Sequence, residues 1–594
     1  MRVFIKTARA QSSIGQLSIK DKIRRLKSID MNKELNVGNQ VSAPSEEDLT
    51  QLVSCYENKQ YAQTSDLAKE IIERYPQHQF TWKILGSALT QEGRVDEALE
   101  ATKNAVQLAP GDADSHFNLG NLFFKLSQFN EAADSQLRAI ELNQDDLQAY
   151  SALAKTLVKL EKLEEAEKYL RLALQKDPNS VVNHFTLSEV LRKRGEFAKA
   201  EGILNELLIM KPTLAEGHYN LGVIQRDLED YDRAAVSYER AIALKSHFID
   251  AYKNLGLIEI IRGNLDKALL CFTNSATLLR GQQQKNPNPS HAFGHISQAK
   301  ITHDIEQFEY LKSKDVNPSL FDELASLYKK LAREIPWPSS TEVISIKKHY
   351  QDAFQGTYNR ILHQPDSKGL NYAVLNEELD TKKITQDYYS HSSGLTFFDN
   401  FLCTPALESL REHLLESTIW FNVKQGGYLG AYLAEGLACP VILQIAKELP
   451  EKFPEIFRSH ALKQVWAYKY ENQSSSTDAA ATGIKVHADF AAVNVNFWIT
   501  PSESNLKRES GGLKVHDIEA PPSWDFESYN SDEELIRKEI EIRRHETSVI
   551  PYRANRIVIF NSNLFHETDE YEFKEGYENR RVNVTMLFGE RTSV

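Results

Sequence analysis

Apolar and small residues recur with a fixed period over the first half of the chain. The period is 34 residues, and each unit predicts two amphipathic helices with small residues at their closest approach. The two most regular positions hold Leu85, Leu119, Leu153, Leu187, Leu221 and Leu255, and Ala98, Ala132, Ala166, Ala200, Ala234 and Ala268. One such unit is too small to bury its apolar face alone, so the pattern predicts a stack of helix pairs.

The repeat resembles a known family. Pro76, Pro110, Pro178 and Pro212 fall where the second helix of their units should stop, because proline cannot continue a helix. Together with the leucines and alanines, this pattern resembles the tetratricopeptide repeat over six full units from about 77 to 280, with a degenerate unit at about 43 to 76. The resemblance implies an all-α superhelix whose concave groove binds a protein or peptide.

Asn118, Asn220 and Asn254 immediately precede the repeat leucine of their units. In the family that the pattern resembles, this position faces the groove. A side-chain amide offers both a donor and an acceptor, so these three residues are candidates for holding a partner's peptide backbone. The alternative is that asparagine is simply common there, since other units place Ile84, Ala152 or Thr186 at the same position.

The period stops after residue 280, and the following GQQQKNPNPS is rich in residues that favour turns and linkers. Helical periodicity without the repeat then continues to about residue 335. We therefore expect an N-terminal extension (1–42), the repeats (43–280), a helical connector and linker (281–390) and a further domain (391–594).

From about residue 395 the pattern changes to short runs rich in β-branched and aromatic residues. FFDNFLCTPALESLREHLLE predicts a strand, a turn and a capped helix. The later runs are LKQVWAYKY, IKVHADF, VNVNFWITP, GGLKVH, RIVIF and RRVNVTMLF. Six or more strands bounded by Gly, Pro, Asn or Ser predict a sandwich or barrel.

One of these runs carries a candidate metal site. His487 and Asp489 are two residues apart, so on a strand both side chains point to the same face. His566, after RIVIF, would supply a second imidazole, and two His with one carboxylate leave coordination positions open, as in non-haem Fe(II) oxygenases. The competing interpretation is a surface pair on an edge strand. His516 and His545 are the rivals of His566.

Open positions on such a metal accept a 2-oxo acid, whose second carboxylate needs a cation inside the barrel. Arg581, at the start of RVNVTMLF, is placed for this role. Arg580 is the alternative, because adjacent strand residues face opposite ways and a one-residue register error exchanges them.

The order of His487-x-Asp489, Gly511-Gly512-Leu513, the apolar strand before His566, and Arg581 resembles the Fe(II)/2-oxoglutarate oxygenases over about 390–594. The resemblance is closest to the prolyl-hydroxylase-like branch, in which a Y-x-x-G segment precedes H-x-D. Tyr470 matches its tyrosine, although the glycine is absent.

This second resemblance carries several expectations. It implies a double-stranded β-helix (jelly-roll) with flanking helices, in which His487, Asp489 and His566 bind Fe(II) while Arg581 and Tyr470 hold 2-oxoglutarate. Dioxygen is the other cosubstrate of the implied hydroxylation, and no further catalytic residue is needed. The alternative is a non-catalytic scaffold of repeats with an inactive oxygenase-like domain.

Composition limits the classes of binding partner and the cellular location that we expect. The net charge of -13 disfavours nucleic acid, whose binding depends on Lys and Arg neutralising phosphates. The N-terminal sequence has no apolar stretch long enough for a signal peptide or a membrane span, so we expect a cytoplasmic protein without a membrane partner. The four cysteines form no C-x-x-C pair, which disfavours a disulfide framework or a thiolate zinc site.

Overall fold

The computed structural model describes residues 43–281, 293–338, 342–354, 356–366, 370–458, 460–472, 483–543 and 546–591. The chain divides into two compact units, one ending at Pro212 and one beginning at Thr213. The expected N-terminal extension and the expected linker after Gly281 lie outside the described residues. Among the helices that are described, none combines the length and the apolar character needed to span a membrane.

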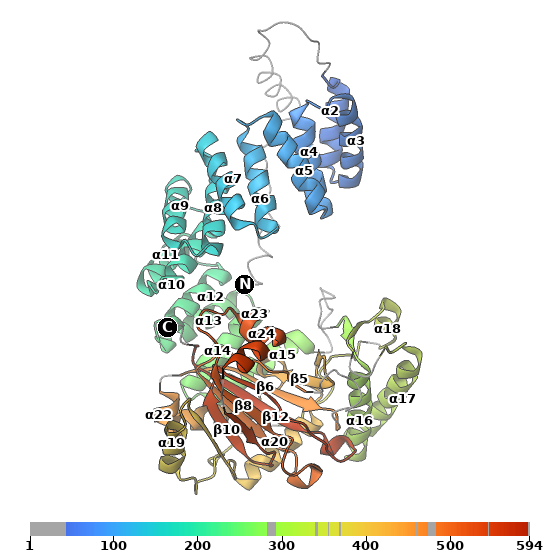
Figure 1. The fold of residues 1–594 in the computed structure, drawn as a ribbon, viewed down its shortest axis with the longest axis vertical. Coiled ribbons are helices and arrows are strands. Elements are labelled where there is room, and N and C mark those ends of the chain that lie inside the picture. The colour runs from blue at the N-terminus through green and yellow to red at the C-terminus, as the bar shows by residue number, and fades with distance from the viewer. Residues whose placement is uncertain are drawn as a thin grey trace. The chain divides into compact units, whose positions relative to one another are not determined.

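The first unit consists of stacked helix pairs, as the period predicts (Figure 1). Its helices are α2 (Glu46–Glu57), α3 (Tyr61–Arg74), α4 (Gln79–Glu92), α5 (Val95–Leu108), α6 (Ala113–Lys125), α7 (Phe129–Leu142), α8 (Leu147–Lys159), α9 (Leu163–Lys176), α10 (Val181–Lys193) and α11 (Phe197–Met210). Pro76, Pro110, Pro178 and Pro212 each lie two residues beyond the end of the second helix of a pair, which confirms their predicted role.

Local sequence explains where these helices begin and how closely they pack. The side chains of Asp112, Asp146 and Ser180 accept hydrogen bonds from the first-turn N–H groups of α6, α8 and α10. A Cβ on Gly86 would lie 2.3 Å from Thr102 Oγ1, and one on Gly120 would lie 2.6 Å from Gln136 Cγ. The glycine after the repeat leucine therefore sets the helix spacing within these pairs.

The second unit begins with two more helix pairs, and further helices and two-residue strands follow. These elements are α12 (Ala215–Asp227), α13 (Tyr231–Leu244), α14 (Ile249–Ile261), α15 (Leu265–Arg280), β1 (His295–Ile296), α16 (Gln298–Ser313), α17 (Pro318–Glu334), β2 (Ile344–Ser345), α18 (Lys348–Ala353) and α19 (Thr381–Ser390). The end of α15 is fastened to the β-rich region by an ion pair of 2.6 Å between Arg280 and Glu435. The domain limits inferred from the sequence stay predictions.

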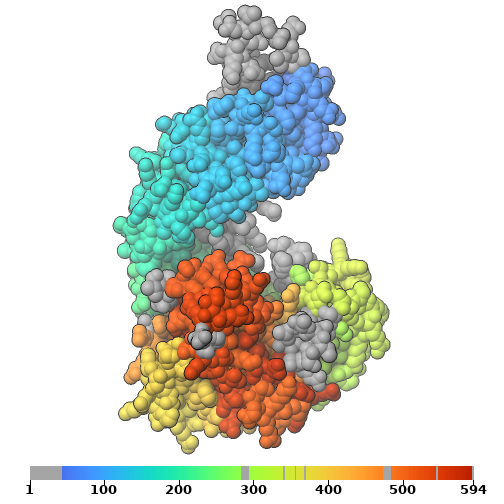
Figure 2. Space-filling model, viewed as in Figure 1, coloured from blue at the N-terminus to red at the C-terminus, as the bar shows by residue number. Residues whose placement is uncertain are grey.

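The connector helices form a lobe beside the β-rich region, seen in yellow-green in Figure 2. Phe308, Phe321, Tyr328 and Phe354 belong to its apolar core. Gln307 on α16 donates two hydrogen bonds from Nε2 to the carbonyl oxygens of residues 415 and 417, at the end of α20. The lobe is thus joined to the β-rich region by buried polar contacts.

The remainder of the second unit is built on two antiparallel sheets. Its elements are β3 (Leu395–Phe398), α20 (Thr404–Glu416), β4 (Asn422–Lys424), β5 (Tyr428–Tyr432), η3 (Leu433–Glu435), α21 (Pro440–Lys452), α22 (Pro454–Phe457), β6 (Leu462–Tyr470), β7 (Val493–Trp498), η4 (Ser502–Ser504), β8 (Leu513–Glu519), α23 (Phe526–Asn530), α24 (Glu533–Ile542), β9 (Thr547–Ile550), β10 (Ile557–Asn561), β11 (Leu564–Thr568), η5 (Tyr577–Asn579) and β12 (Val582–Phe588). The large sheet has the order β3-β10-β7-β12-β6-β5-β4, and the small sheet β11-β8-β9.

Strand alternation separates two apolar cores. One face of the large sheet packs against α20 and α21, and the other faces the small sheet. Along β6, Val465 and Ala467 enter the first core, whereas Tyr470 enters the second. The predicted strands at 462–470, 493–501, 511–516, 556–560 and 580–588 are confirmed within a few residues at their ends.

Gly512 marks a point where only a glycine fits. A Cβ there would lie 1.9 Å from the carbonyl oxygen of Ile550 at the end of β9, and backbone atoms cannot move aside cheaply. We expect Gly512→Ala to lower the free energy of unfolding by about 3 kcal/mol, measured by chemical denaturation. Gly202→Ala is the control, because that exposed position on α11 has open space and alanine should stabilise the helix by up to about 1 kcal/mol. Unchanged stability of Gly512→Ala would contradict the close approach.

Candidate metal centre

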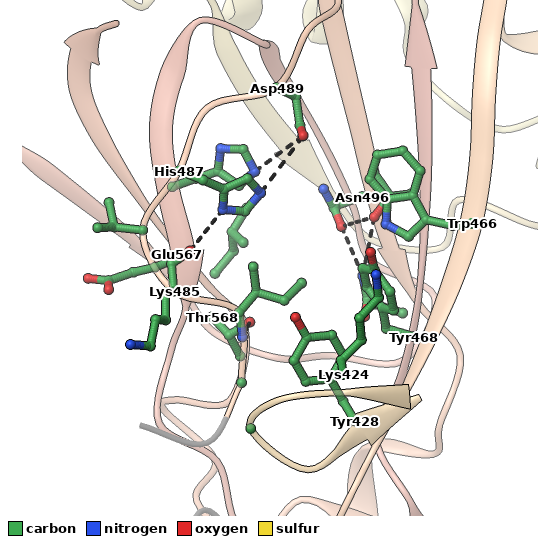
Figure 3. A pocket seen from close by; sticks show the side chains of 18 of the residues that line it. Lys424, Tyr428, Trp466, Tyr468, Lys485, His487, Asp489, Asn496, Glu567 and Thr568 are labelled. Carbon is green, nitrogen blue, oxygen red and sulfur yellow. Dashed lines mark hydrogen bonds and ion pairs between the residues drawn. The ribbon is translucent and has the colours of Figure 1, made fainter. Parts of the chain in front are cut away.

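Three side chains from two distant stretches of chain converge on one point (Figure 3). His487 Nε2 lies 3.8 Å from Asp489 Oδ1, and His566 Nε2 lies 3.5 Å from Asp489 Oδ2. The candidate ligand atoms of all three residues lie within 4.8 Å of one another. This spacing fits a single cation bound by two imidazoles and a carboxylate.

The other nitrogen of each imidazole fixes its tautomer. His487 Nδ1 lies 2.8 Å from the carbonyl oxygen of Lys485, and His566 Nδ1 lies 3.0 Å from that of Leu564. A carbonyl oxygen only accepts hydrogen bonds, so both Nδ1 atoms carry the proton. Both Nε2 lone pairs are therefore left to face Asp489, which is how metal-binding histidines are usually held.

The backbone that presents His487 is not the regular strand that the sequence predicts. His487 and His566 exchange two backbone hydrogen bonds, of 3.0 and 2.8 Å, and form an isolated bridge. Beyond it, Ala488 N–H donates to the carbonyl oxygen of Tyr529, and Asp489 N–H to that of Ser562. The ladder ends because Ala488 pairs with α23 instead, so the predicted strand at 484–490 is wrong.

The protonation states suit a cation. Burial, with help from the neighbouring His566, lowers the pKa of His487 to about 4, so the imidazole is neutral at neutral pH. Burial alone would raise the pKa of Asp489, but contacts that favour the carboxylate, among them the hydrogen bond from Asn494, outweigh burial and lower that pKa. The centre thus presents a neutral imidazole at His487 and a carboxylate at Asp489, beside the second imidazole of His566.

Asn494 and Asn496 on β7 support the carboxylate. Asn494 Nδ2 donates to Asp489 Oδ2 at 2.5 Å, and Asn496 Nδ2 donates to Asn494 Oδ1 at 2.8 Å. Asn496 lines the cavity, and Asn494 orients the carboxylate.

The centre opens into a cavity of about 810 Å³ between the two sheets. Tyr428, Trp466 and Tyr468 from β5 and β6 form much of one side, and Phe526 and Asn530 of α23 contribute another wall. The ion pairs Lys485–Glu533 (2.6 Å) and Arg537–Glu567 (3.0 Å) tie α24 to the histidine-bearing segments. Helices α23 and α24 therefore shape the mouth of the cavity.

Arg581 is a buried cation on the same cavity, with 2% of its surface exposed. Nε donates to Gly511 O at 2.8 Å and Nη2 to Gly512 O at 3.1 Å, whereas Nη1 is buried without a hydrogen-bond partner among the described residues. No carboxylate in the described part of the chain forms an ion pair with it. A buried guanidinium in this state suits an anionic ligand.

The register of β12 decides which of the two adjacent arginines faces the cavity. Arg580 Nε binds Glu306 of α16 at 2.8 Å, outside the cavity lining. Tyr470 lies in the cavity, with the guanidinium carbon of Arg581 4.5 Å from the centre of its ring. Burial raises the pKa of Tyr470, so its phenol stays protonated. The structure thus places Arg581 and Tyr470 together, and Arg580 elsewhere.

None of the other described candidates belongs to the metal cluster. His516 on β8 lies beside Glu567, with 3.6 Å between Nε2 and Oε1, and does not join the cluster. His545 lies outside the described residues. Asn118, Asn220 and Asn254 are half-buried on α6, α12 and α14, and Asn254 Nδ2 already donates to the Tyr219 hydroxyl at 3.0 Å.

Sequence reasoning missed Trp466, Tyr468, Asn583 and Thr585, which line the cavity from β6 and β12. Alternation along both strands was visible, since each of them places every second residue on the face opposite the helix-covered core. The missing information was the pairing of Thr585 with Trp466 and of Asn583 with Tyr468, which depends on register.

The family models that match this chain all lie within its repeat region. Models described as TPR repeat or tetratricopeptide repeat match residues 86–127, 117–181, 157–219 and 215–248. The chain therefore contains tetratricopeptide repeats, followed by a β-rich region. No curated protein matches the chain.

Several solved structures are similar to the repeats. YrrB, described as a TPR protein with an unusual peptide-binding site, is 22% identical over 31% of this chain and 95% of its own, with a TM-score of 0.28. MamA from Desulfovibrio magneticus RS-1 is 19% identical over 29% of this chain and 97% of its own, with a TM-score of 0.27. A tetratricopeptide repeat protein from Parabacteroides merdae is 16% identical over 41% and 94%, with a TM-score of 0.34.

Proposed function

We propose that the β-rich region is a non-haem Fe(II)- and 2-oxoglutarate-dependent dioxygenase that hydroxylates its substrate, and that the repeats recruit a protein or peptide. The observation that carries this proposal is the convergence of His487, Asp489 and His566 on the cavity that also holds the guanidinium of Arg581, which forms no ion pair among the described residues. A metal-binding cluster or a buried arginine by itself is compatible with several functions. Together they provide a metal site and an anion site in one cavity.

Strand connections support the jelly-roll form of this fold. From β6 onward the chain passes back and forth between the sheets, except that β8 and β9 are paired neighbours in the small sheet. β6 lies in the large sheet, the 484–489 segment lies against β11, and β7 lies in the large sheet before β8 and β9. β10, β11 and β12 continue the alternation. Such a chain winds around both sheets as a double-stranded β-helix does.

The donor set fits Fe(II). Two neutral imidazoles and one carboxylate are the ligands of the facial triad, with positions left for a cosubstrate. Asn494 orients Asp489, and the carbonyl oxygens of Lys485 and Leu564 orient the two rings. The residues that would bind the metal are thus held before it arrives, which lowers the ordering that binding requires.

Arg581 fits the distal carboxylate of 2-oxoglutarate. Its Nη1 is buried and has no hydrogen-bond partner in the described part of the chain, and a carboxylate would both satisfy that donor and neutralise the charge. Two aromatic rings, of Tyr470 and Tyr571, flank the guanidinium at 4.5 and 5.7 Å and keep it in place. Tyr470 is proposed as a second contact for the cosubstrate.

The division of work follows from these positions. When bound, Fe(II) with 2-oxoglutarate and dioxygen supplies the oxidation that converts a substrate C–H bond into C–OH while the cosubstrate becomes succinate and carbon dioxide. The protein's own residues position the cosubstrate and enclose the metal centre. Arg581 and the metal ligands fix the two ends of the cosubstrate, and the wall of α23 and α24 limits water access to the centre.

An anaerobic titration tests this function against a non-catalytic scaffold. Adding Fe(II) and then 2-oxoglutarate to the full chain should produce a visible charge-transfer band that neither component gives alone. Exposure to oxygen should then convert 2-oxoglutarate to succinate, even without a substrate. Absence of the band at saturating cosubstrate would favour the scaffold.

A further inference from the structure

The charge of Asp489 sets the direction of a chain of amide groups that crosses the large sheet. A carboxylate only accepts, so Asn494 must donate to it through Nδ2 and keep Oδ1 as an acceptor. Asn496 Nδ2 fills that acceptor, which leaves Asn496 Oδ1 to accept in turn. No amide in this chain can be flipped without placing two like groups against each other.

The chain of hydrogen-bonded amide groups ends at β12, where two side chains donate to Asn496 Oδ1. These are Asn583 Nδ2 at 3.1 Å and Thr585 Oγ1 at 2.8 Å. Because the Asn583 amide is committed as a donor, its Oδ1 is the free end of the chain. Asn583 is 97% buried, lines the cavity, and has no hydrogen-bond partner for Oδ1 among the described residues.

A second unpaired group lies on the adjacent strand. Trp466 is directly opposite Thr585, and Tyr468 is opposite Asn583, so Trp466 and Asn583 are diagonal neighbours on one face of the sheet. Trp466 Nε1 is also buried without a partner in the described part of the chain, and the residue lines the same cavity. Figure 3 shows Trp466, Tyr468 and Asn496 together on one side of the cavity.

We infer that the cavity binds an amide group of the substrate, whose N–H donates to Asn583 Oδ1 and whose carbonyl oxygen accepts from Trp466 Nε1. One acceptor and one donor, both desolvated and about one diagonal step apart, match the two ends of an amide. A buried donor or acceptor that is left unpaired destabilises the empty cavity, so a ligand that satisfies both groups is favoured. The substrate role of this ligand rests on the proposed function.

Other ligand chemistries fit less well. A carboxylate could accept from Trp466 but would place its charge against Asn583 Oδ1, at the end of a chain that begins on the Asp489 carboxylate. 2-Oxoglutarate has no N–H to offer Asn583. An ammonium group could donate to Asn583 but would leave the indole N–H unpaired. A peptide group or a carboxamide side chain satisfies both, which agrees with a peptide substrate.

The test uses small amides and needs no turnover. The full chain, 15N-labelled at tryptophan, is titrated with N-methylacetamide and, separately, with N,N-dimethylacetamide, which lacks the N–H. The indole N–H signal of Trp466, assigned with Trp466→Phe, should shift downfield and saturate with N-methylacetamide. The dimethyl compound should bind about tenfold more weakly, the value of one lost hydrogen bond at a desolvated acceptor.

Variants locate the acceptor. Asn583→Leu should weaken N-methylacetamide binding about tenfold and abolish the preference over the dimethyl compound, while Thr585 still donates to Asn496. Asn561→Leu is the matched control, because that exposed amide binds Glu519 outside the cavity lining. Equal binding of the two amides by the unaltered protein, or no movement of the Trp466 signal, overturns the inference even if Asn583→Leu fails to fold.

The outcome separates this inference from the proposed function. Binding of N-methylacetamide without a charge-transfer band would leave an amide-binding cavity that lacks oxygenase chemistry. A band without amide discrimination would leave the oxygenase and remove the amide as its ligand. The amide-binding inference and the proposed oxygenase function can therefore be refuted independently of each other.

Discussion

Alanine at position 566 should abolish metal binding by this chain. His566 supplies one of only two imidazoles in the cluster, and even a partner that merely orients a ligand typically contributes 10–100-fold to metal affinity. We therefore expect His566→Ala to weaken Fe(II) binding by at least ~100-fold. Anaerobic calorimetry with Fe(II), and with Zn(II) as a redox-inert probe, measures the affinity, and succinate formation from 2-oxoglutarate should fall to background.

His516→Ala is the matched control for this variant. His516 lies on the neighbouring strand β8, is largely buried, and contacts Glu567 rather than the cluster. Its removal should leave metal affinity within about twofold of the unaltered protein, because it offers no ligand atom to the site. The opposite pattern, with Fe(II) binding lost in His516→Ala and kept in His566→Ala, would exclude the proposed ligand set.

The repeats show what a sequence predicts well. A residue type that recurs across units at one position of the period, such as Ala98 or Ala132, is fully buried in the structure because small size is needed at the same place in every helix pair. The signal is repeated along the chain, so a single sequence supplies several independent observations of one environment. The family matches at 86–248 agree with it.

The candidate site was less accessible to sequence reasoning. The spacing of His487 and Asp489 was interpreted as strand geometry, yet the two side chains converge through an isolated bridge and a contact with Tyr529. Convergence itself could be anticipated because both residues fall between paired strands. The local backbone conformation could not be anticipated, because it depends on hydrogen bonds between Ala488 and residues of α23, which is distant in the sequence.

A sequence does not reveal which buried polar atoms have hydrogen-bond partners and which do not. Asn583 and Trp466 are ordinary strand residues until the coordinates show which of their atoms lack partners. The same holds for Arg581, whose distinction from Arg580 rests on which guanidinium meets Glu306 and which remains without a carboxylate.

Replacing Arg581 by leucine should remove recognition of the distal carboxylate and leave the metal site intact. The guanidinium would form charge-assisted hydrogen bonds with that carboxylate inside a buried cavity, so we expect the dissociation constant for 2-oxoglutarate to rise ~100-fold. Zn(II) affinity should stay the same, because Arg581 contacts none of the three ligands in the described hydrogen bonds. Anaerobic titration of the charge-transfer band measures the cosubstrate affinity.

Two comparisons isolate the carboxylate contact from general damage. 2-Oxobutyrate keeps the metal-binding end of the cosubstrate but lacks the distal carboxylate, so it should bind the unaltered protein and Arg581→Leu equally. Arg580→Leu removes the adjacent guanidinium and its ion pair with Glu306, and should leave 2-oxoglutarate affinity unchanged. A loss of 2-oxoglutarate affinity in Arg580→Leu with none in Arg581→Leu would mean that the cosubstrate binds outside this cavity, because only Arg581 of the two lines it.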